Sequence, residues 1–122
     1  MKSLIAFTIF ICFISCKDKH TFIGKDVAKQ QLKEALTEKK NSQQQFVKMP
    51  VDDENEAIVA AEPILFNTYG KDEILSEKHY KAYLMDNYWV INGTLPQGMM
   101  GGTFLIIFSI KDGSIIKLTH DK

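Results

Sequence analysis

The sequence predicts an α+β domain in which one helix packs on a curved antiparallel sheet of about four strands. Two observations favour this class. An apolar helical stretch over residues 53–69 comes first. Two alternating apolar segments follow it, residues 80–93 and 103–120, and each can fold as a hairpin.

The helix is expected to begin after Asp53 and to end before Gly70. An aspartate at the cap accepts hydrogen bonds from the first turn, and Glu56, three residues later, suits a capping box. Glycine readily adopts the left-handed conformation that ends helices. Pro63 lies inside the helix and removes one hydrogen bond. We therefore expect a kink near residues 59–63 or two shorter helices.

The first hairpin is expected to turn at Asp86-Asn87, because both residues tolerate positive φ. A two-residue turn there puts apolar and aromatic side chains together on one face of the hairpin. The expected pairs are Leu84 with Trp89, Ala82 with Ile91, and Tyr80 with Gly93.

The second hairpin could turn in two ways. A two-residue turn at 112–113 would place apolar residues opposite polar ones. A three-residue loop, 111–113, with Gly113 in a left-handed bulge collects the apolar residues on one face, and we prefer it. The expected pairs are Phe108 with Ile116, Ile106 with Leu118, and Phe104 with His120. The strand 103–110 is apolar on both faces and should be central or covered.

The chain begins with a short apolar run, residues 4–14, preceded by Lys2. Eleven helical residues rise about 16 Å, too little for a hydrocarbon core of about 30 Å. The run fits a cleaved leader, and Phe13-Ile14-Ser15-Cys16 resembles a lipobox. We expect residues 1–15 to be a lipoprotein signal peptide and Cys16 to be the lipid attachment site. This places the protein in the cell envelope, anchored to a membrane and facing the periplasm or exterior; an uncleaved anchor or a soluble secreted form are the alternatives.

Residues 16–50 are expected to form a polar, partly helical tether. A helix is plausible over residues 26–40, but its apolar stripe is thin and is expected to bury little. A solvated spacer is therefore favoured over a helix lying on the bilayer. The globular domain is expected over residues 51–122. It has no internal disulfide, because Cys16 is the only cysteine left after cleavage.

Composition and motifs exclude several classes of function. Lysine plus arginine and aspartate plus glutamate each number 15, so no net charge favours a nucleic-acid partner. The three histidines lack metal-ligand spacing, so we expect neither a metal nor another cofactor. The loop 95–102 lacks the ending of a phosphate loop, and no serine has a nucleophile context. We expect no catalytic residues.

A series of short segments occurs in order within residues 51–122. They are Ala57-Ile58, Tyr69-Gly70-Lys71, Tyr80-Lys81-Ala82, Tyr88-Trp89-Val90-Ile91-Asn92-Gly93-Thr94-Leu95-Pro96, Gly101-Gly102 and Lys111-Asp112-Gly113-Ser114-Ile115-Ile116-Lys117-Leu118-Thr119-His120. Together they resemble the immunity proteins with a nuclear transport factor 2 (NTF2) fold. The resemblance implies a small cone-shaped fold and a role in polymorphic toxin systems. It implies a non-enzymatic protein that binds and neutralises a cognate protein toxin.

Five residues are candidates for lining a pocket or contacting a partner: Tyr80, Trp89, Met99, Met100 and His120. His120 is either a functional base or ligand contact, or a satisfied edge histidine. The two methionines are adaptable apolar contacts at a loop tip, or part of a loop plug. Trp89 is most simply a core residue.

Two further hypotheses remain open at this stage. The acidic cluster of Asp52, Asp53, Glu54 and Glu56 complements a helix N-terminus, or contacts a basic toxin. A cone cavity lined by Tyr80, Tyr83, Trp89 and His120 could serve a small-ligand binder or an enzyme. A structural envelope lipoprotein is a third possibility.

Overall fold

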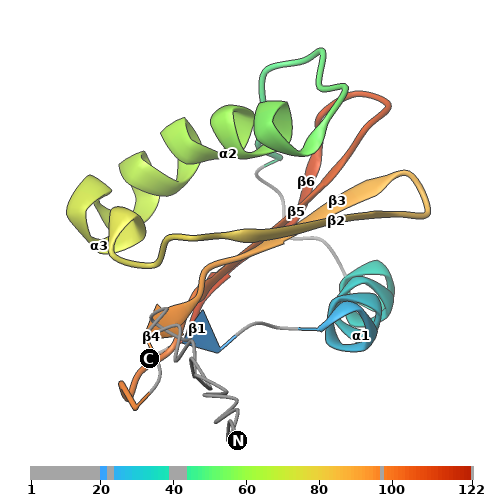
Figure 1. Ribbon diagram of the computed structural model, residues 1–122. Coiled ribbons are helices and arrows are strands. Elements are labelled where there is room, and N and C mark those ends of the chain that lie inside the picture. Colours follow the sequence, from blue (N-terminus) through green and yellow to red (C-terminus); the bar gives the residue numbers. More distant parts are fainter. Residues whose placement is uncertain (1–19, 22–23, 39–43, 97, 122) are drawn as a thin grey trace, which may run out of the picture.

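The computed structural model describes residues 20–21, 24–38, 44–96 and 98–121 (Figure 1). A four-stranded antiparallel sheet, in the order β2-β3-β5-β6, forms its centre. The strands are β2 (Lys81–Met85), β3 (Tyr88–Asn92), β5 (Phe104–Ser109) and β6 (Ile115–His120). Helices α2 (Glu54–Tyr69) and α3 (Lys71–Leu75) cover one face, and α1 (Lys25–Thr37) lies on the other. The predicted α+β class is confirmed.

A second, two-stranded sheet pairs β1 (His20–Thr21) with β4 (Leu95–Pro96). The expected signal peptide, residues 1–15, and the expected lipid attachment site Cys16 lie outside the described residues. In the described part of the chain, no helix combines the length and the apolar character that crossing a bilayer requires.

Helix α2 begins and ends where the sequence predicts. The side chain of Asp53 accepts a hydrogen bond from the Glu56 N–H at 2.8 Å, and Gly70, with φ of 96°, follows the last residue. The Glu56 carboxylate accepts from the N–H of Asp52 at 2.9 Å, one residue before the position a capping box uses. The helix continues through Pro63, so the alternative of two shorter helices is wrong. Pro63 lies on the exposed side, where water can replace the hydrogen bond that proline removes.

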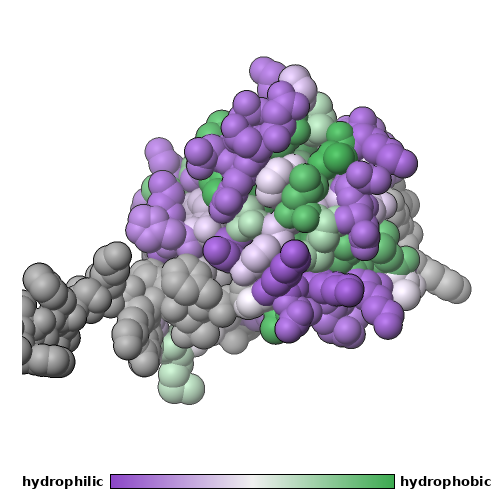
Figure 2. Space-filling view, turned by 45° about the vertical axis from the view of Figure 1, so that its right-hand side comes forward, coloured by the Kyte–Doolittle hydropathy of each residue, from purple (hydrophilic) through white to green (hydrophobic). Residues whose placement is uncertain are grey.

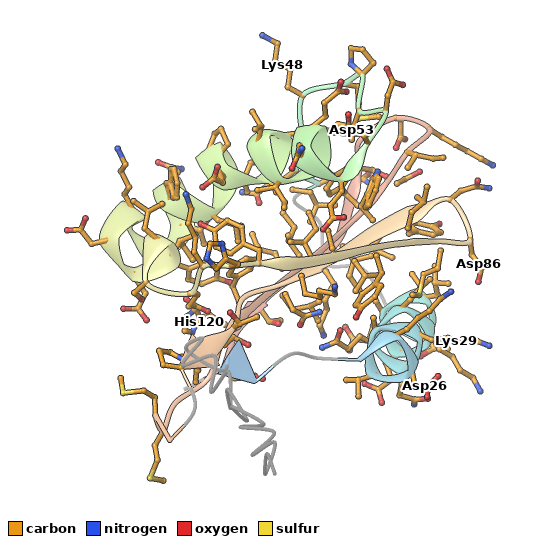
Figure 3. All side chains as sticks on the ribbon, viewed as in Figure 1. Asp26, Lys29, Lys48, Asp53, Asp86 and His120 are labelled. Atoms are coloured by element: carbon orange, nitrogen blue, oxygen red, sulfur yellow. The ribbon has the colours of Figure 1, made fainter. Side chains whose placement is uncertain are left out.

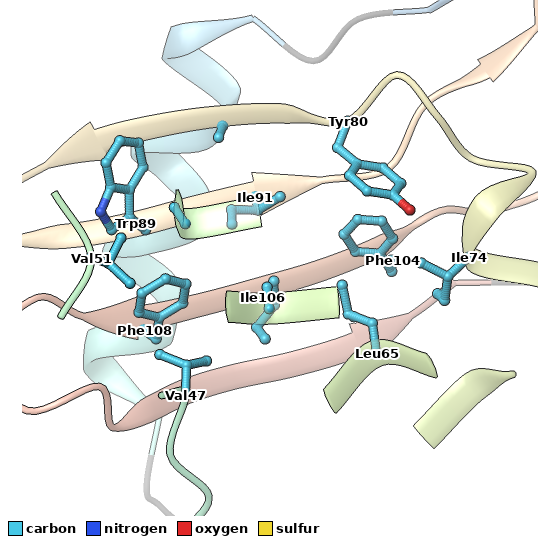
Figure 4. Packing of buried hydrophobic residues seen from close by; sticks show 13 residues of the cluster. Val47, Val51, Leu65, Ile74, Tyr80, Trp89, Ile91, Phe104, Ile106 and Phe108 are labelled. Atoms are coloured by element: carbon cyan, nitrogen blue, oxygen red, sulfur yellow. The ribbon is translucent and has the colours of Figure 1, made fainter. Parts of the chain in front are cut away.

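The main core lies between α2 and the sheet (Figure 4). Phe104, Ile106 and Phe108, alternate residues of β5, point into it. The small side chains of Ala57 and Ala61 on α2 are fully buried, which lets the helix lie close to the strands. Strand β5 thus supplies Phe104 and Phe108, the two largest fully buried side chains, and α2 supplies two buried alanines.

The first hairpin has the predicted register. Ala82 pairs with Ile91 and Leu84 with Trp89. Asp86 and Asn87 have φ of 49° and 66°, as a two-residue turn between twisted strands requires. Pairing begins at Lys81 and Asn92, so the expected Tyr80–Gly93 pair lies beyond the ladder.

The second hairpin differs from the prediction at its turn. Phe104 pairs with His120 and Ile106 with Leu118, as expected. Phe108, however, pairs with Ile115 rather than Ile116, because a bulge interrupts the ladder. The N–H of Ser109 donates to Ser114 O at 2.9 Å, so the loop comprises residues 110–113 and is one residue longer than expected. Gly113 has φ of 78°, in the left-handed region that the prediction assigned to it.

Helix α1 is confirmed, but the expectation that it buries little is wrong. Ala28, Leu32 and Ala35 are buried against Val90 and Ile107, which point to the second face of the sheet. A narrow stripe suffices here because the alanines let the helix approach an apolar sheet closely. Residues 25–37 are therefore part of the folded layer structure and not a solvated spacer.

Polar contacts fix the position of α1 on the sheet. The amide groups of Gln31 and Asn92 exchange two hydrogen bonds, of 3.0 and 2.9 Å. Lys117 Nζ on β6 lies 2.7 Å from the Glu38 carboxylate at the end of the helix. Asn92 is buried, so its pairing with Gln31 satisfies an amide that would otherwise be costly.

The segment before α2 also joins the fold. Val47 and Val51 belong to the main core. The N–H of Val47 donates to Gly113 O, and the N–H of Ile115 donates to Gln45 O, both at 2.9 Å. The expected tether therefore includes residues that close the β6 end of the sheet.

A pair of leucine variants tests the docking of α1. Leu32 is 2% exposed and Leu36 is 52% exposed, and both lie on the same helix. Leu32→Ala should lower the free energy of unfolding by about 2–5 kcal/mol, because it leaves a cavity against the sheet. Leu36→Ala should change it by less than about 1 kcal/mol. Urea unfolding of both variants measures this, and equal effects would contradict a docked helix.

Candidate functional site

A buried carboxylate lies at the end of the sheet next to α3. Glu77, just past the end of that helix, is 1% exposed. Its Oε1 accepts a hydrogen bond from the N–H of Phe104 at 2.7 Å, and its Oε2 lies 2.9 Å from His120 Nε2. A buried carboxylate is tolerated only when such partners compensate its lost hydration. Glu77 thereby connects α3 to both β5 and β6.

His120 ends β6 with both ring nitrogens engaged (Figure 3). Nδ1 lies 2.7 Å from the carbonyl oxygen of Asp121, and the ring centroid lies 5.3 Å from that of Tyr69. The carbonyl and the Glu77 carboxylate can only accept hydrogen bonds, so both nitrogens carry protons in this geometry. Burial lowers the pKa of His120, but the hydrogen bond to Glu77 and its charge outweigh burial, and the net pKa is raised. The pair is thus an ion pair.

A second carboxylate completes the cluster. Glu73 Oε1, on α3, lies 3.6 Å from His120 Nε2, and its side chain is 58% exposed. One ligand atom each from Glu73, Glu77 and His120 can be chosen so that all lie within 4.8 Å of one another. We name these three residues the Glu-Glu-His cluster.

Gly93 has no side chain, and this leaves space for the buried side chain of Glu77. A Cβ atom there would lie 2.6 Å from Glu77 Oε1 and 2.9 Å from Phe104 Cδ2. The next residue, Thr94, donates its N–H to the carbonyl of Glu77 at 2.9 Å. A glycine is therefore required where the Glu77 side chain crosses the strand end.

Tyr80 lies near this cluster, with its ring 5.1 Å from that of Phe104 in an edge-to-face arrangement. Its hydroxyl donates to Glu62 Oε2 at 3.1 Å. Burial, followed by the charge of Glu62 and the hydrogen bond to it, raises the pKa of Tyr80. The hydroxyl stays a protonated donor, which fits a structural role between α2 and the sheet.

The other sequence candidates lie elsewhere. Trp89 is buried opposite Phe108, toward the other end of the sheet, and among the described residues its Nε1 has no hydrogen-bond partner. Met99 and Met100 are exposed in the loop before β5. Tyr83 packs in the layer that α1 covers, on the other face from Tyr80. The structure brings Tyr80 and His120 together around Phe104 and separates them from the rest.

The space between α2 and the sheet is filled by core side chains. Phe104 and Trp89 both lie in the main core, which removes the support for a ligand cavity there. Among the described residues, these two side chains occupy the place where the hypothesis of a small-ligand binder or enzyme puts its cavity.

A hollow of about 510 Å³ lies instead on the outside of α2, near its N-terminus. It is lined by Lys48, Met49, Pro50, Asn55, Glu56, Val59, Ala60 and Pro63. We name it the α2 groove. Val59 is 67% exposed, the most exposed of the apolar helix residues Val27, Leu36 and Val59. The charged residues of the lining are Lys48 and Glu56, and the exposed residues Asp52, Asp53 and Glu54 adjoin the groove in sequence.

Figure 2 shows apolar side chains gathered in a band that hydrophilic side chains border on both sides. Figure 3 places Lys48 and Asp53 together at the N-terminal end of α2. Apolar patches with polar rims are typical of protein-binding surfaces.

Sequence reasoning missed both the Glu-Glu-His cluster and the α2 groove. The sequence pattern does not predict α3, and the three histidines have no cysteine or second histidine at ligand spacing. The i, i+4 spacing of Glu73 and Glu77, combined with the predicted Phe104–His120 pair, was the available signal. The groove needs residues 48–50, which the sequence suggested were outside the domain.

Comparison with known protein families assigns the fold. Residues 56–122, more than half of the chain, match the family described as NTF2 fold immunity protein. The chain belongs to this family. The helix-on-sheet arrangement agrees with an NTF2-like fold, and the family indicates a role in toxin immunity and points to a non-catalytic protein.

Two curated relatives are similar to the chain, both from Escherichia coli (strain K12). The uncharacterised protein YhhH is 34% identical over 67 residues, which is 54% of this chain and 53% of YhhH. The uncharacterised protein YbbC is 34% identical over 77 residues, 62% of this chain and 63% of YbbC. The chain thus spans between half and two thirds of the relatives it matches. No solved structure matches it.

Variants at the two glutamates test the ion pair. Glu77→Ala should lower the free energy of unfolding by about 3–5 kcal/mol, because it leaves His120 and the Phe104 N–H without their buried partner. Glu73→Ala, at the exposed carboxylate, should cost about 1 kcal/mol or less. Urea unfolding followed by the fluorescence of Trp89, the single tryptophan, measures both. A cost for Glu77→Ala no larger than that for Glu73→Ala would contradict the assignment.

Proposed function

We propose that this protein is a membrane-tethered immunity protein that binds and neutralises a cognate protein toxin in the cell envelope. Membership of the NTF2 fold immunity family over residues 56–122 carries the proposal. It acts by binding the toxin and not by catalysis. Two geometric features support the proposal: the α2 groove supports toxin binding, and the position of β1 supports the membrane tether.

The α2 groove supports the binding step. Its lining is largely apolar, and its volume of about 510 Å³ accommodates several side chains of a partner. The acidic residues Asp52, Asp53 and Glu54 beside it favour a partner with basic residues around an apolar anchor. We assign the groove to a toxin segment of this character, with Val59 as its central contact.

The position of β1 supports the tether. Strand β1 begins at His20, four residues after Cys16, and pairs with β4. Four extended residues span about 14 Å at most, so a lipid on Cys16 would hold this end of the molecule at the membrane. The N-terminal end of α2 lies at the opposite end of the molecule (Figure 1). The α2 groove would then face away from the bilayer, toward an arriving toxin.

Co-expression with the toxin encoded next to this gene tests the proposal. The unaltered chain should protect the cells, and Val59→Arg should weaken toxin binding at least about tenfold, because it places a cation in the apolar groove facing a basic partner. Val27→Arg is the matched control. It is also an exposed valine on a helix, but α1 lies on the other face of the sheet. Cys16→Ala should reduce protection through lost membrane concentration without changing affinity.

Two results would count against the proposal. The absence of both protection and toxin binding by the unaltered chain would reject the immunity function. Equal affinities for Val59→Arg and the unaltered chain would reject the α2 groove as the contact surface while leaving the family function standing.

A further inference from the structure

We infer that Glu73, Glu77 and His120 bind a zinc ion that joins α3 to the end of β6. The site lies apart from the α2 groove and is independent of the proposed toxin binding. Its members come from two segments far apart in the sequence, so an ion there would act as a cross-link within the fold. Neither the family assignment nor the named relatives assign such a site.

The distances between the three groups suit a shared ion. His120 Nε2 lies 2.9 Å from Glu77 Oε2 and 3.6 Å from Glu73 Oε1. Two ligands at about 2.0–2.2 Å from one zinc ion in tetrahedral geometry lie about 3.3–3.6 Å apart. The two spacings from His120 Nε2 bracket this value, and ligand atoms of Glu73 and Glu77 lie within 4.8 Å of each other, so side-chain movement at the exposed Glu73 would complete the site.

The histidine is already oriented as a metal ligand. Its Nδ1 lies 2.7 Å from the carbonyl oxygen of Asp121, an acceptor that fixes the proton on Nδ1. Metal-bound histidines typically donate their second nitrogen to a backbone carbonyl in this way. The remaining nitrogen, Nε2, points at both carboxylates. Zinc would replace the proton that Nε2 carries in the ion pair.

The buried carboxylate is oriented as well. The N–H of Phe104 holds Glu77 Oε1 at 2.7 Å, which turns Oε2 toward His120. Gly93 leaves the space through which this side chain passes. Phe104 and Gly93 lie at the ends of β5 and β3, so the backbone of the sheet holds the Glu77 side chain in place. The site therefore needs little reorganisation to accept an ion.

Charge and ligand type favour zinc over other common ions. Two carboxylates and one protonated imidazole leave a net negative charge, whereas two carboxylates, a neutral imidazole and Zn²⁺ sum to zero. Zero net charge at the site is favourable because Glu77 is only 1% exposed and a buried net charge loses its hydration. An imidazole ligand suits zinc better than Mg²⁺ or Ca²⁺, which take oxygen ligands. The exposure of Glu73 leaves a fourth position open to water.

Zinc titration of the full chain in competition with a coloured chelator tests the site. Cys12→Ser and Cys16→Ser are introduced throughout, because free thiolates also bind zinc. We expect one zinc ion per chain, with binding at least tenfold weaker in Glu73→Gln and His120→Asn. His79→Ala, which removes an exposed histidine outside the cluster, is the control and should bind as the parent does.

A thermal shift provides the second measurement. Zinc should raise the melting temperature of the parent and of His79→Ala, but not that of His120→Asn. Glu73 is 58% exposed, so Glu73→Gln keeps the fold, and circular dichroism checks this. No zinc bound by the parent, or unchanged affinity in folded Glu73→Gln, would overturn the site. An equal loss in His79→Ala would overturn the assignment to these three residues.

Discussion

Strand β5 must be covered on both faces, and the rest of the structure follows from that requirement. Phe104, Ile106 and Phe108 point to one side, and Ile107 points to the other. No single helix can bury both sides of such a strand, because successive side chains point in opposite directions. Helix α2 and the residues before it cover the aromatic side, and α1 covers the other. A central position between β3 and β6 protects the backbone groups of β5 as well.

The same layering places polar groups where the apolar cover ends. Asn92 is at the end of β3 and is paired with Gln31 of α1 on one face. Glu77 lies at the neighbouring end on the other face, held by Phe104 and His120. Each buried polar group meets a partner from a different element, so these contacts fix the alignment of helices on the sheet. The burial of an unpaired amide or carboxylate in a shifted alignment would be costly.

Local rules predicted much of this fold. The cap of α2 at Asp53, its end at Gly70 and the turn at Asp86-Asn87 depend only on nearby residues, and all three were confirmed. The turn of the second hairpin was one residue longer than predicted because Ser109 and Ser114 close it with a backbone hydrogen bond. Register near a bulge depends on such contacts as well as on the apolar pattern.

The burial of α1, the Glu-Glu-His cluster and the α2 groove depend on contacts between residues far apart in the sequence, and the sequence pattern does not predict such contacts. The stripe of Ala28, Leu32 and Ala35 is thin by itself, and its burial depends on the apolar second face of the sheet. The Glu-Glu-His cluster requires α3 to meet the last residue of β6, and the i, i+4 spacing of Glu73 and Glu77 indicates only that the two carboxylates can share one side of a helical turn. Of the predicted site residues, Tyr80 and His120 came together because the strand register was correct. The α2 groove was missed because residues 48–50 had been placed in the tether.

Amide hydrogen exchange followed by mass spectrometry tests the two-sided cover most directly. If α1 is a permanent layer of the fold, the amides of residues 25–37 should exchange nearly as slowly as those of α2, which covers the opposite face. Exchange of residues 25–37 at the rate of an unfolded peptide, with β5 still fully protected, would contradict the account. It would show that β5 does not need its second cover.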